Sequence, residues 1–406
     1  MNIIYLNHYA GSETLGMEFR PYYISRELQK LGHRVLVIAG DFSHLRKQNP
    51  TITEDYEIQD IEGVPYMFLR TGTYQGNGIQ RVQSMLRYVL KIIRGKKTIL
   101  RYMTPDAVIC SSTYPLDTYA GRTLAKAAGA RLYHEIHDLW PLSPMELGGY
   151  GKHHPFIMLM QQAENAAYKH SNKIISILPN IEGHVRGLGF DTPIVHVPNG
   201  LPASYFQSPS PAHPSVVATV EQLKKTHRHV IAYAGGLSVS NAMMDFVRSF
   251  EHLKDYSIAG VIIGSGIERE TLRQEAANKG YPIVFLDPIP KENIIGSLKQ
   301  CDSLYVGSNQ NKLYQYGLAM NKMFDYLMAG RPVVAAVAGS HSPIHSLGLA
   351  VLAQPENPVD IARAIIEASR LPDEQLQQIA ERSPAFVKEY HNYENLARHF
   401  AEALEA

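Results

Sequence analysis

The sequence predicts an α/β protein made of two doubly wound domains in tandem. The first observation is a regular alternation of strand-like and helix-like segments, seen first where "NIIYL" and "HRVLVIAG" enclose the helical stretch "PYYISRELQKLG". A strand, a helix and a second strand in this order form a parallel unit with a right-handed crossover. The second observation is that many strand-like runs are almost continuously Val and Ile, which is typical of strands covered on both faces. The third is the length of 406 residues, which is too long for one average core.

The same pattern continues along the chain and sets the expected domain limits. In the first half, strand-like runs occur at "DAVICSS", "ARLYHEIHD", "KIISIL" and "PIVHVPNG", which gives a first domain over residues 1–205. Residues 206–228 begin with clustered Pro and Ser and are predicted as the linker. The runs "HVIAYAGG", "SIAGVIIGSG", "PIVFLD", "DSLYVGS" and "RPVVAAV" then predict a second domain over 229–385. A polar helix over 386–406 closes the chain.

The composition is that of an ordinary globular protein and limits the classes of partner. The formal net charge of +1 gives no global electrostatic case for binding nucleic acid. Cys110 and Cys301 cannot build a disulfide framework, and we interpret them as reduced core thiols, as in a cytosolic protein. The first residues lack the pattern of a signal peptide, and no apolar run reaches the roughly 18–20 residues of a membrane span. We therefore expect a cytoplasmic protein.

Residues 81–101 form an unusual basic segment, "RVQSMLRYVLKIIRGKKTILR", in which seven basic residues stand among apolar ones. No acidic residue occurs between Glu62 and Asp106. One interpretation is a helical stretch with a solvated basic face. The other is a surface that binds anionic lipid, with Lys and Arg extending around an apolar stripe. Lipid binding would appear as sedimentation with anionic vesicles that weakens with salt, and no sedimentation at low salt would exclude it.

Candidate site residues follow the strands, because ligands of open α/β sheets bind at the carboxyl ends of strands and the cleft shared by two such domains is the expected site. In the first domain, Gly11 and Gly16 flank the loop after the first strand, where small residues allow a close approach to a phosphate. A flexible connection is the alternative. His137 and Asp138 end another strand and are expected to orient a substrate hydroxyl or exchange protons near neutral pH. The alternative is a structural histidine in a turn.

The second domain opens with "YAGGLSVSN", which we expect to line a donor site. Gly235 and Gly236 bring the backbone close to a ligand, and Ser238 and Asn241 can hydrogen-bond a phosphate or sugar. Gly264 ends the next strand in "GSG". The sequence contains no G-x-x-x-x-G-K-[ST] loop and no G-x-G-x-x-G after the first strand. These absences disfavour a P-loop enzyme and a dehydrogenase.

The stretch "MNKMFDYLMAGRPVV", residues 320–334, predicts a helix start followed by a buried strand. Asn321 is expected to cap the helix by accepting the amide of Phe324 and to contribute to binding a phosphate at the helix start. Lys322 lies in the first turn, where a lysine is favourable only if an anion binds the helix amides and the ammonium together. Asp325 shares its face and could accept hydrogen bonds from a ribose diol. A simple surface Lys–Asp pair is the alternative.

An ordered set of motifs resembles the GT-B glycosyltransferases of family 4. Along the chain these motifs are the loop after the first strand, "HDLWP", "VPNG", "YAGG", "GSG", "NKMFDYLMAGRPVV" and "EYHNYENLARHF". The resemblance is strongest to bacterial cell-surface polysaccharide enzymes related to L-fucosamine transferases. It implies two Rossmann-like domains with a cleft between them and a last helix that crosses back to the first. It also implies a hexosyltransferase-type enzyme that takes a sugar from a nucleotide-sugar, usually a UDP-sugar, with retention of configuration and with no metal or other cofactor.

The resemblance further implies a donor on the second domain and a glycan or lipid-linked acceptor on the first. Gly11 and Gly16 would then lie on the acceptor side. Such enzymes make O-antigen or capsule in the cytoplasm, some of them peripherally on the inner face of the cytoplasmic membrane. Asp325 falls where the family has the second Glu of its E-x7-E motif, and Gly317 stands in place of the first. "SVSNAM" replaces the family's Arg and Lys phosphate clamp. Lys322 is therefore expected to supply the missing positive charge and to act in catalysis with His137 and Asp138.

Two rival functions share these features. A nucleotide-sugar 2-epimerase has the same two-domain architecture and would release free epimerised sugar nucleotide without an acceptor. A non-catalytic, membrane-associated partner of a polysaccharide-assembly complex would fit the basic segment and the missing motif residues. Such a partner would bind no nucleotide-sugar at all.

Overall fold

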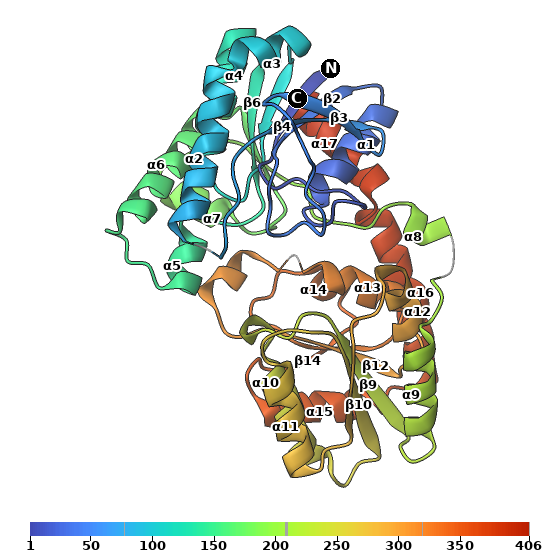
Figure 1. Cartoon of the computed structure of the whole chain (residues 1–406). Coiled ribbons are helices and arrows are strands. Elements are labelled where there is room, and N and C mark those ends of the chain that lie inside the picture. The colour runs from blue at the N-terminus through green and yellow to red at the C-terminus, as the bar shows by residue number, and fades with distance from the viewer. Residues whose placement is uncertain (77, 208–209, 319, 406) are drawn as a thin grey trace. The chain divides into compact units, whose positions relative to one another are not determined.

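The computed structural model describes residues 1–76, 78–207, 210–318 and 320–405, and its chain divides into two compact units (Figure 1). Unit 1 comprises Met1–Asn199 together with Tyr393–Ala406, and unit 2 comprises Gly200–Asn392. Each unit is a mainly parallel sheet with helices on both faces. The predicted fold class, two doubly wound α/β domains in tandem, is confirmed.

Unit 1 contains an eight-stranded sheet in the order β3-β4-β2-β1-β5-β6-β7-β8. All neighbouring strands pair in parallel except β3 and β4, which form an antiparallel edge. The strands are β1 (Asn2–Leu6), β2 (Arg34–Gly40), β3 (Glu57–Ile61), β4 (Val64–Leu69), β5 (Ala107–Cys110), β6 (Arg131–Ile136), β7 (Lys173–Ser176) and β8 (Ile194–His196). Ile4 of β1 lies between Leu36 of β2 and Val108 of β5, and all three side chains are buried, so this central row of the sheet is apolar.

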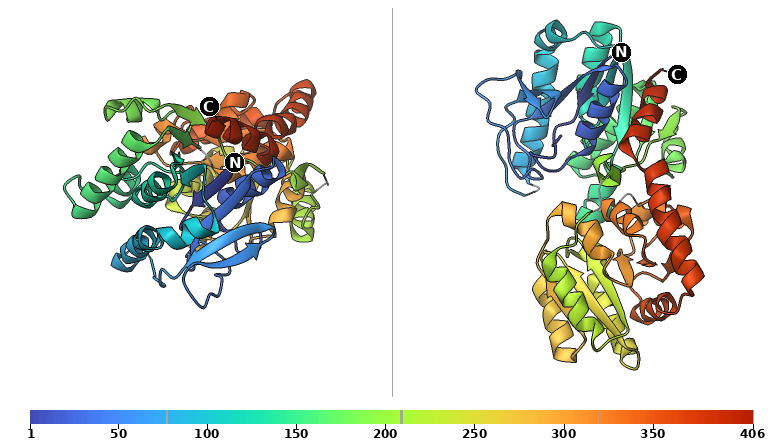
Figure 2. Two further views of the ribbon diagram at one scale, coloured as in Figure 1. Left: turned by 90° about the horizontal axis from the view of Figure 1, so that it is seen from above. Right: turned by 90° about the vertical axis from the view of Figure 1, so that its right-hand side faces the viewer.

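The helices of unit 1 cover this sheet in two layers. They are α1 (Arg20–Lys30), α2 (Ile79–Arg94), α3 (Lys96–Tyr102), α4 (Asp117–Ala128), α5 (Leu142–Gly148), α6 (Pro155–His170), α7 (Glu182–Gly187) and α17 (Tyr393–Glu405). One core joins the sheet to α1 and α17, the blue and red helices of this unit (Figure 2). In it, the rings of Tyr23 and Tyr393 stack with their centres 4.9 Å apart. A second core joins the other face to α2, α4 and α6. The last helix of the chain is thus an integral part of unit 1.

Unit 2 contains a six-stranded parallel sheet in the order β11-β10-β9-β12-β13-β14. Its strands are β9 (His229–Ala234), β10 (Ile258–Ile263), β11 (Ile283–Leu286), β12 (Ser303–Gly307), β13 (Val333–Ala336) and β14 (Val351–Leu352). Its α-helices are α8 (Ser204–Gln207), α9 (Pro214–Lys224), α10 (Met243–Ser249), α11 (Arg269–Lys279), α12 (Ile294–Leu298), α13 (Asn321–Ala329), α14 (Pro343–Leu347), α15 (Pro358–Ala368) and α16 (Asp373–Tyr390). Short 3₁₀ helices include η1 (Val239–Asn241) and η3 (Lys291–Asn293).

The unit boundaries differ from the predicted domain limits in two places. The segment expected as a linker, 206–228, contains α9, which buries Val216 and Val220 in the core of unit 2. The single helix expected over 386–406 is instead two helices, because α16 ends at Tyr390 and α17 begins at Tyr393. His391, between them, packs its ring 4.7 Å from that of Phe324 in unit 2. Aromatic packing therefore fixes the end of unit 2 just before the chain enters unit 1.

The predicted basic segment forms α2 and α3. The inner face of α2 buries Met85, Tyr88 and Ile92, whereas Leu86 and Leu90 remain 38% and 44% exposed. Lys91 pairs with Asp55 at 2.6 Å, so part of the basic face has a protein partner. Within the described ranges, no helix has the length and apolar character needed to cross a bilayer. Binding to anionic lipid stays a prediction.

Candidate functional site

The predicted site residues fall into two groups, one in each unit. In unit 1, the carboxyl end of β6 carries a buried charge cluster, which we call the Glu135 cluster and which contains Tyr5, Arg20, Ser111, Glu135 and His137. Arg20 Nε lies 2.9 Å from Glu135 Oε1, and the two side chains are 1% and 0% exposed. The hydroxyls of Tyr5 and Ser111 donate to the other carboxylate oxygen, which also lies 3.1 Å from His137 Nε2. The cluster is therefore a buried Arg20–Glu135 ion pair whose carboxylate is also hydrogen-bonded by Tyr5, Ser111 and His137.

These contacts decide the protonation of His137. Burial alone would raise the pKa of Glu135, but Arg20 outweighs it and holds that pKa well below its usual range. Burial alone would lower the pKa of His137, yet hydrogen bonds to Glu135 and Glu18 raise it to about 9. Glu18 Oε1 lies 3.5 Å from His137 Nδ1. His137 is thus an imidazolium at neutral pH, which suits a proton donor or a fixed positive charge rather than the general base that proton exchange near pH 7 would need.

Asp138, the next residue, has a different environment. Its Oδ1 accepts hydrogen bonds from the amide of Leu139 at 3.0 Å and from the hydroxyl of Ser143. Burial raises the pKa of Asp138 despite these bonds. The carboxylate fixes the turn that leads into α5, which is a structural role, and it also lines an adjacent cavity.

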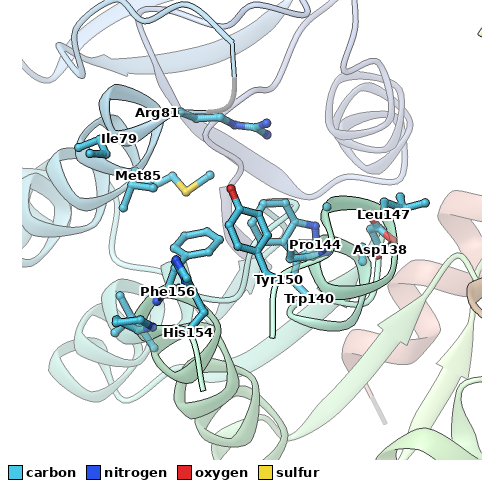
Figure 3. Close-up of a pocket in the computed structure, with 16 residues that line it drawn as sticks. Ile79, Arg81, Met85, Asp138, Trp140, Pro144, Leu147, Tyr150, His154 and Phe156 are labelled. Atoms are coloured by element: carbon cyan, nitrogen blue, oxygen red, sulfur yellow. Dashed lines mark hydrogen bonds between the residues drawn. The ribbon is translucent and has the colours of Figure 1, made fainter. Parts of the chain in front are cut away.

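That cavity, which sequence reasoning did not predict, has a volume of about 730 Å³ and lies between α2, α5 and α6 (Figure 3). Most of its lining is apolar, including Met85, Trp140, Phe156 and Leu159. The signal in the sequence was the chain's single tryptophan, Trp140, directly after "HDL".

Gly11 and Gly16 lie inside their loop rather than lining an open cradle. A Cβ at Gly11 would stand 1.9 Å from the carbonyl oxygen of Gly16, and a Cβ at Gly16, where φ is +97°, would stand 2.7 Å from the amide nitrogen of Lys47. The amide of Gly11 donates to the carbonyl of Glu18 at 2.8 Å. The two glycines therefore allow the tight loop that places Glu18 beside His137. Contact of this loop with an acceptor stays a prediction.

In unit 2 the structure brings three predicted donor-site residues, Gly236, Ser238 and Asn241, together near the ammonium of Lys322, with Tyr233, which was not predicted. Its Nζ donates to the hydroxyl of Tyr233 at 2.8 Å and to Asn241 Oδ1 at 2.5 Å, and it lies 4.7 Å from the Tyr233 ring centre. Asn241 Nδ2 in turn donates to the carbonyl of Gly236 at 3.0 Å and to Ser238 Oγ at 2.9 Å. No carboxylate within the described residues pairs with Lys322. Burial lowers the pKa of Lys322 to about 8.

Two glycines make this arrangement possible. A Cβ at Gly235 would stand 3.2 Å from Lys322 Nζ, and a Cβ at Gly264 would stand 2.0 Å from the carbonyl oxygen of Gly235. Their φ values are +155° and +156°, which L side chains rarely adopt. At both glycines the backbone lies close to its neighbours, which are the lysine and the adjoining strand end. The predicted close approach of Gly235 and Gly236 to a ligand stays a prediction.

The structure at the start of α13 differs from the predicted helix cap of Asn321 and from the alternative of a surface pair between Lys322 and Asp325. Asn321 is the exposed first residue of the helix, Met320 precedes it as the N-cap, and no side chain caps the helix, so the prediction that Asn321 caps it is wrong. Lys322 and Asp325 do not form the simple pair considered as the alternative. Asp325 is only 4% exposed, and its Oδ2 binds Lys291 Nζ at 2.5 Å.

The carboxylate of Asp325 remains partly unsatisfied. Its Oδ1 is buried and has no hydrogen-bond partner, and burial raises its pKa although Lys291 lowers it. Sequence reasoning missed Lys291. Its signal was its position directly after the "FLDPIP" loop at the end of a strand. Among the described residues, no group of three or more His, Cys, Asp and Glu is placed to hold a metal ion. That the reaction needs no metal stays a prediction.

Comparison with known proteins assigns both units to one kind of enzyme. Residues 15–205 match the family model Glycosyltransferase Family 4, and residues 228–370 match Glycosyl transferases group 1. No curated protein was found that matches the chain in sequence.

Solved structures show the same fold at low identity. Sucrose-phosphate synthase from Thermosynechococcus elongatus matches with a TM-score of 0.74 and 13% identity, over 99% of this chain and 98% of its own. HepE from Anabaena, in complex with UDP-glucose, matches with a TM-score of 0.65 and 15% identity, over 100% and 99%. A glycosyltransferase from Rickettsia africae matches with a TM-score of 0.69 and 16% identity, over 100% and 97%. With these folds and the two family matches, the chain is a glycosyltransferase of the GT-B fold with a family 4 amino-terminal domain.

Proposed function

We propose that this enzyme transfers a hexose from a UDP-sugar to a glycan or lipid-linked acceptor during the synthesis of a bacterial surface polysaccharide, such as O-antigen or capsule. The transfer retains the configuration at the sugar carbon and uses no metal. It takes place in the cytoplasm, at the inner face of the cytoplasmic membrane. The complex of HepE with UDP-glucose, a protein of the same fold, supports a uridine nucleotide as donor.

The observation that carries the proposal is the state of Lys322. Its largely buried ammonium contacts two neutral oxygens and no carboxylate in the described part of the chain, at the start of a helix without a side-chain cap or first-turn acid. An isolated buried charge is unfavourable. An anion bound there would receive the ammonium together with the amides of the first turn. The donor diphosphate has that charge.

The reaction follows from this placement. The bond between the sugar carbon and the diphosphate oxygen breaks, the acceptor oxygen bonds to the same carbon, and the acceptor proton leaves with the diphosphate. Lys322 stabilises the charge that develops on the leaving group, an effect typically worth several kcal/mol. Asp325 Oδ1, which is buried without a partner, accepts one ribose hydroxyl, while Lys291 holds the other carboxylate oxygen.

His137 and Asp138 belong to the acceptor side of the proposal. His137 is held as an imidazolium by Glu135 and Glu18, so it acts as a fixed positive charge near the acceptor. A His137→Ala variant that binds donor normally but no longer transfers sugar would support this role. Full activity of that variant would refute it.

A thermal-shift panel of UDP-, GDP- and dTDP-sugars tests the proposal. A donor present at 100 times its Kd stabilises the folded protein by about 2.7 kcal/mol, so the right nucleotide raises Tm by mass action. UDP-sugars should raise Tm in the wild-type enzyme and raise it far less in Lys322→Ala. Stabilisation by none of the sugars would contradict the proposal and favour a non-catalytic partner. Release of free epimerised nucleotide-sugar without an acceptor would contradict it in favour of an epimerase.

A further inference from the structure

The cavity of unit 1 has the character of a site for a hydrocarbon chain. About 730 Å³ is enough for a drug-sized ligand, and the walls present Met85, Trp140, Phe156 and Leu159. At the rim, Ile79 and Leu147 are 77% and 61% exposed. Large apolar side chains exposed around an apolar cavity mark a binding surface, because leaving them in water is unfavourable.

The charges around the cavity favour an anionic group at its mouth. Arg81 lines the cavity, where its guanidinium lies 6.0 Å from the ring centre of Trp140 (Figure 3). Its Nε donates to the hydroxyl of Tyr9 at 3.2 Å, and the guanidinium lies 5.3 Å from the centre of that ring. It belongs to α2, and neither α2 nor α3 carries an acidic residue. Among the described residues of the lining the one acid is Asp138, which already accepts hydrogen bonds from Leu139 and Ser143. An apolar chain with an acidic head is therefore complementary in both shape and charge.

The cavity also adjoins the predicted acceptor residues. Asp138 is part of its wall, and His137 precedes Asp138 at the end of β6. A chain bound between α2 and α6 would hold the group attached to it near the Glu135 cluster.

We propose that this cavity binds the hydrocarbon chain of a lipid-phosphate-linked acceptor, with the phosphate at Arg81. The inference rests on the proposed function and narrows its acceptor to a prenyl or alkyl phosphate carrying the sugar to be extended. The alternatives of a flat membrane surface and of a protein helix are outcomes of the test below.

Trp140 gives a direct readout, because it is the chain's only tryptophan and lines the cavity. Octyl, decyl and dodecyl phosphate are titrated below their critical micelle concentrations while Trp140 fluorescence is followed. Each buried methylene strengthens binding about fourfold, so dodecyl phosphate should bind at least tenfold more tightly than octyl phosphate. Methyl phosphate should give no saturable change.

Matched variants locate the binding. Leu159→Glu places a charge in the wall, and dodecyl phosphate binding should fall at least tenfold. Met158→Glu, the adjacent position on α6, is 49% exposed and outside the lining, and it should bind as the wild type does. Leu147→Glu at the exposed rim repeats the test at a position where folding is not at risk. Arg81→Met should weaken octyl phosphate at least fivefold but leave octanol unchanged.

The outcomes separate this inference from the proposed function, because the titration involves no donor. Saturable, chain-length-dependent binding that is lost in Leu159→Glu and Leu147→Glu supports the cavity even if no sugar transfer is found. No saturable change with any alkyl phosphate overturns it even if UDP-sugars stabilise the enzyme. A fluorescence change seen only with anionic vesicles, and equal in the Met158→Glu and Leu159→Glu variants, overturns it in favour of a flat membrane surface. A response only to an amphipathic peptide likewise overturns it.

Discussion

Replacing Lys322 by Met should weaken donor binding and stabilise the ligand-free protein at the same time. For the donor, the change removes a charge-assisted hydrogen bond to phosphate, worth about 1.5–3 kcal/mol. That range corresponds to a rise of about 10- to 150-fold in the donor KM. Lys279→Met, at an exposed position of unit 2, is the matched control and should leave the KM unchanged.

The stability half of this prediction comes from the burial of the ammonium. Lowering its pKa from 10.5 to about 8 corresponds to about 3 kcal/mol of unfavourable free energy at neutral pH in the ligand-free protein. Loss of the hydrogen bonds to Tyr233 and Asn241 offsets part of this gain, at about 1 kcal/mol each. The net stabilisation should be about 1 kcal/mol, or about 2–4 °C in the Tm of a domain of this size. A lysine that served only to hold the loop would show a fall in Tm instead.

The pH dependence gives an independent check. Because the folded pKa of Lys322 is lowered, its unfavourable contribution is complete below pH 8 and disappears as the pH rises toward 10.5. The stability advantage of Lys322→Met should therefore shrink above pH 8. Over the same range, kcat/KM for the donor should fall in the wild type as the ammonium deprotonates, with no such decline in the variant. A donor KM within twofold of the wild type, or a lower Tm, would refute the reasoning.

Three further predictions concern the Glu135 cluster of unit 1 and the residues around Lys322 and Asp325 in unit 2. The pKa of His137 is raised to about 9, so the stability that its charge contributes is complete below pH 6.5 and is lost as the pH rises through 9. Urea unfolding followed by Trp140 fluorescence should show that the free energy of unfolding of the wild type falls by about 3 kcal/mol over this range. The His137→Gln variant should lack this pH-dependent fall. Gly264→Ala should destabilise unit 2 by at least about 2 kcal/mol in thermal unfolding, because its Cβ would meet a carbonyl oxygen at 2.0 Å. The control Gly236→Ala, which has open space around its Cβ, should change stability by less than about 1 kcal/mol. Equal effects of the two changes would contradict the packing argument. Asp325→Asn keeps the shape but removes the charge of the proposed ribose acceptor, so the donor KM should rise about tenfold or more with little change in Tm, and an unchanged KM would remove Asp325 from the donor site.

The fold could be predicted because its determinants are local. Runs such as "HVIAYA" and "IAGVII" became strands buried along their whole length, as expected for parallel strands covered on both faces. The short edge strand β3, "EIQDI", was missed because its residues are only half-buried or exposed and carry charges. The boundaries near 206 and 386 were misplaced because packing, rather than composition, decides to which unit α9 and α16 belong.

The site could be predicted only as a set of positions. Strand ends pointed to His137 and Gly235, and a helix start pointed to Lys322. The structure places each of them near polar partners, but those partners are distant in sequence. Glu135 and Arg20 are 115 positions apart, and Lys291 and Asp325 are 34 apart. Neither spacing follows from a local pattern, so the protonation of His137 and the partial pairing of Asp325 required the structure.

The two polar clusters differ in how completely their charges are balanced, and this difference argues for different roles. In the Glu135 cluster, Arg20 Nε donates to Glu135, and its terminal nitrogens donate to the carbonyls of Pro198 and Val197. The buried charge therefore has its hydrogen-bond partners before any ligand binds. Such a cluster holds its neighbours in place and gains little from a ligand. Around α13, by contrast, the Lys322 ammonium contacts only neutral oxygens among the described residues, and one Asp325 oxygen has no partner. The unbalanced ammonium of Lys322 and the unused oxygen of Asp325 are unfavourable in the ligand-free protein. They become favourable when an anion binds the first and a hydroxyl donates to the second. A nucleotide-sugar should therefore gain most of its favourable binding free energy at α13.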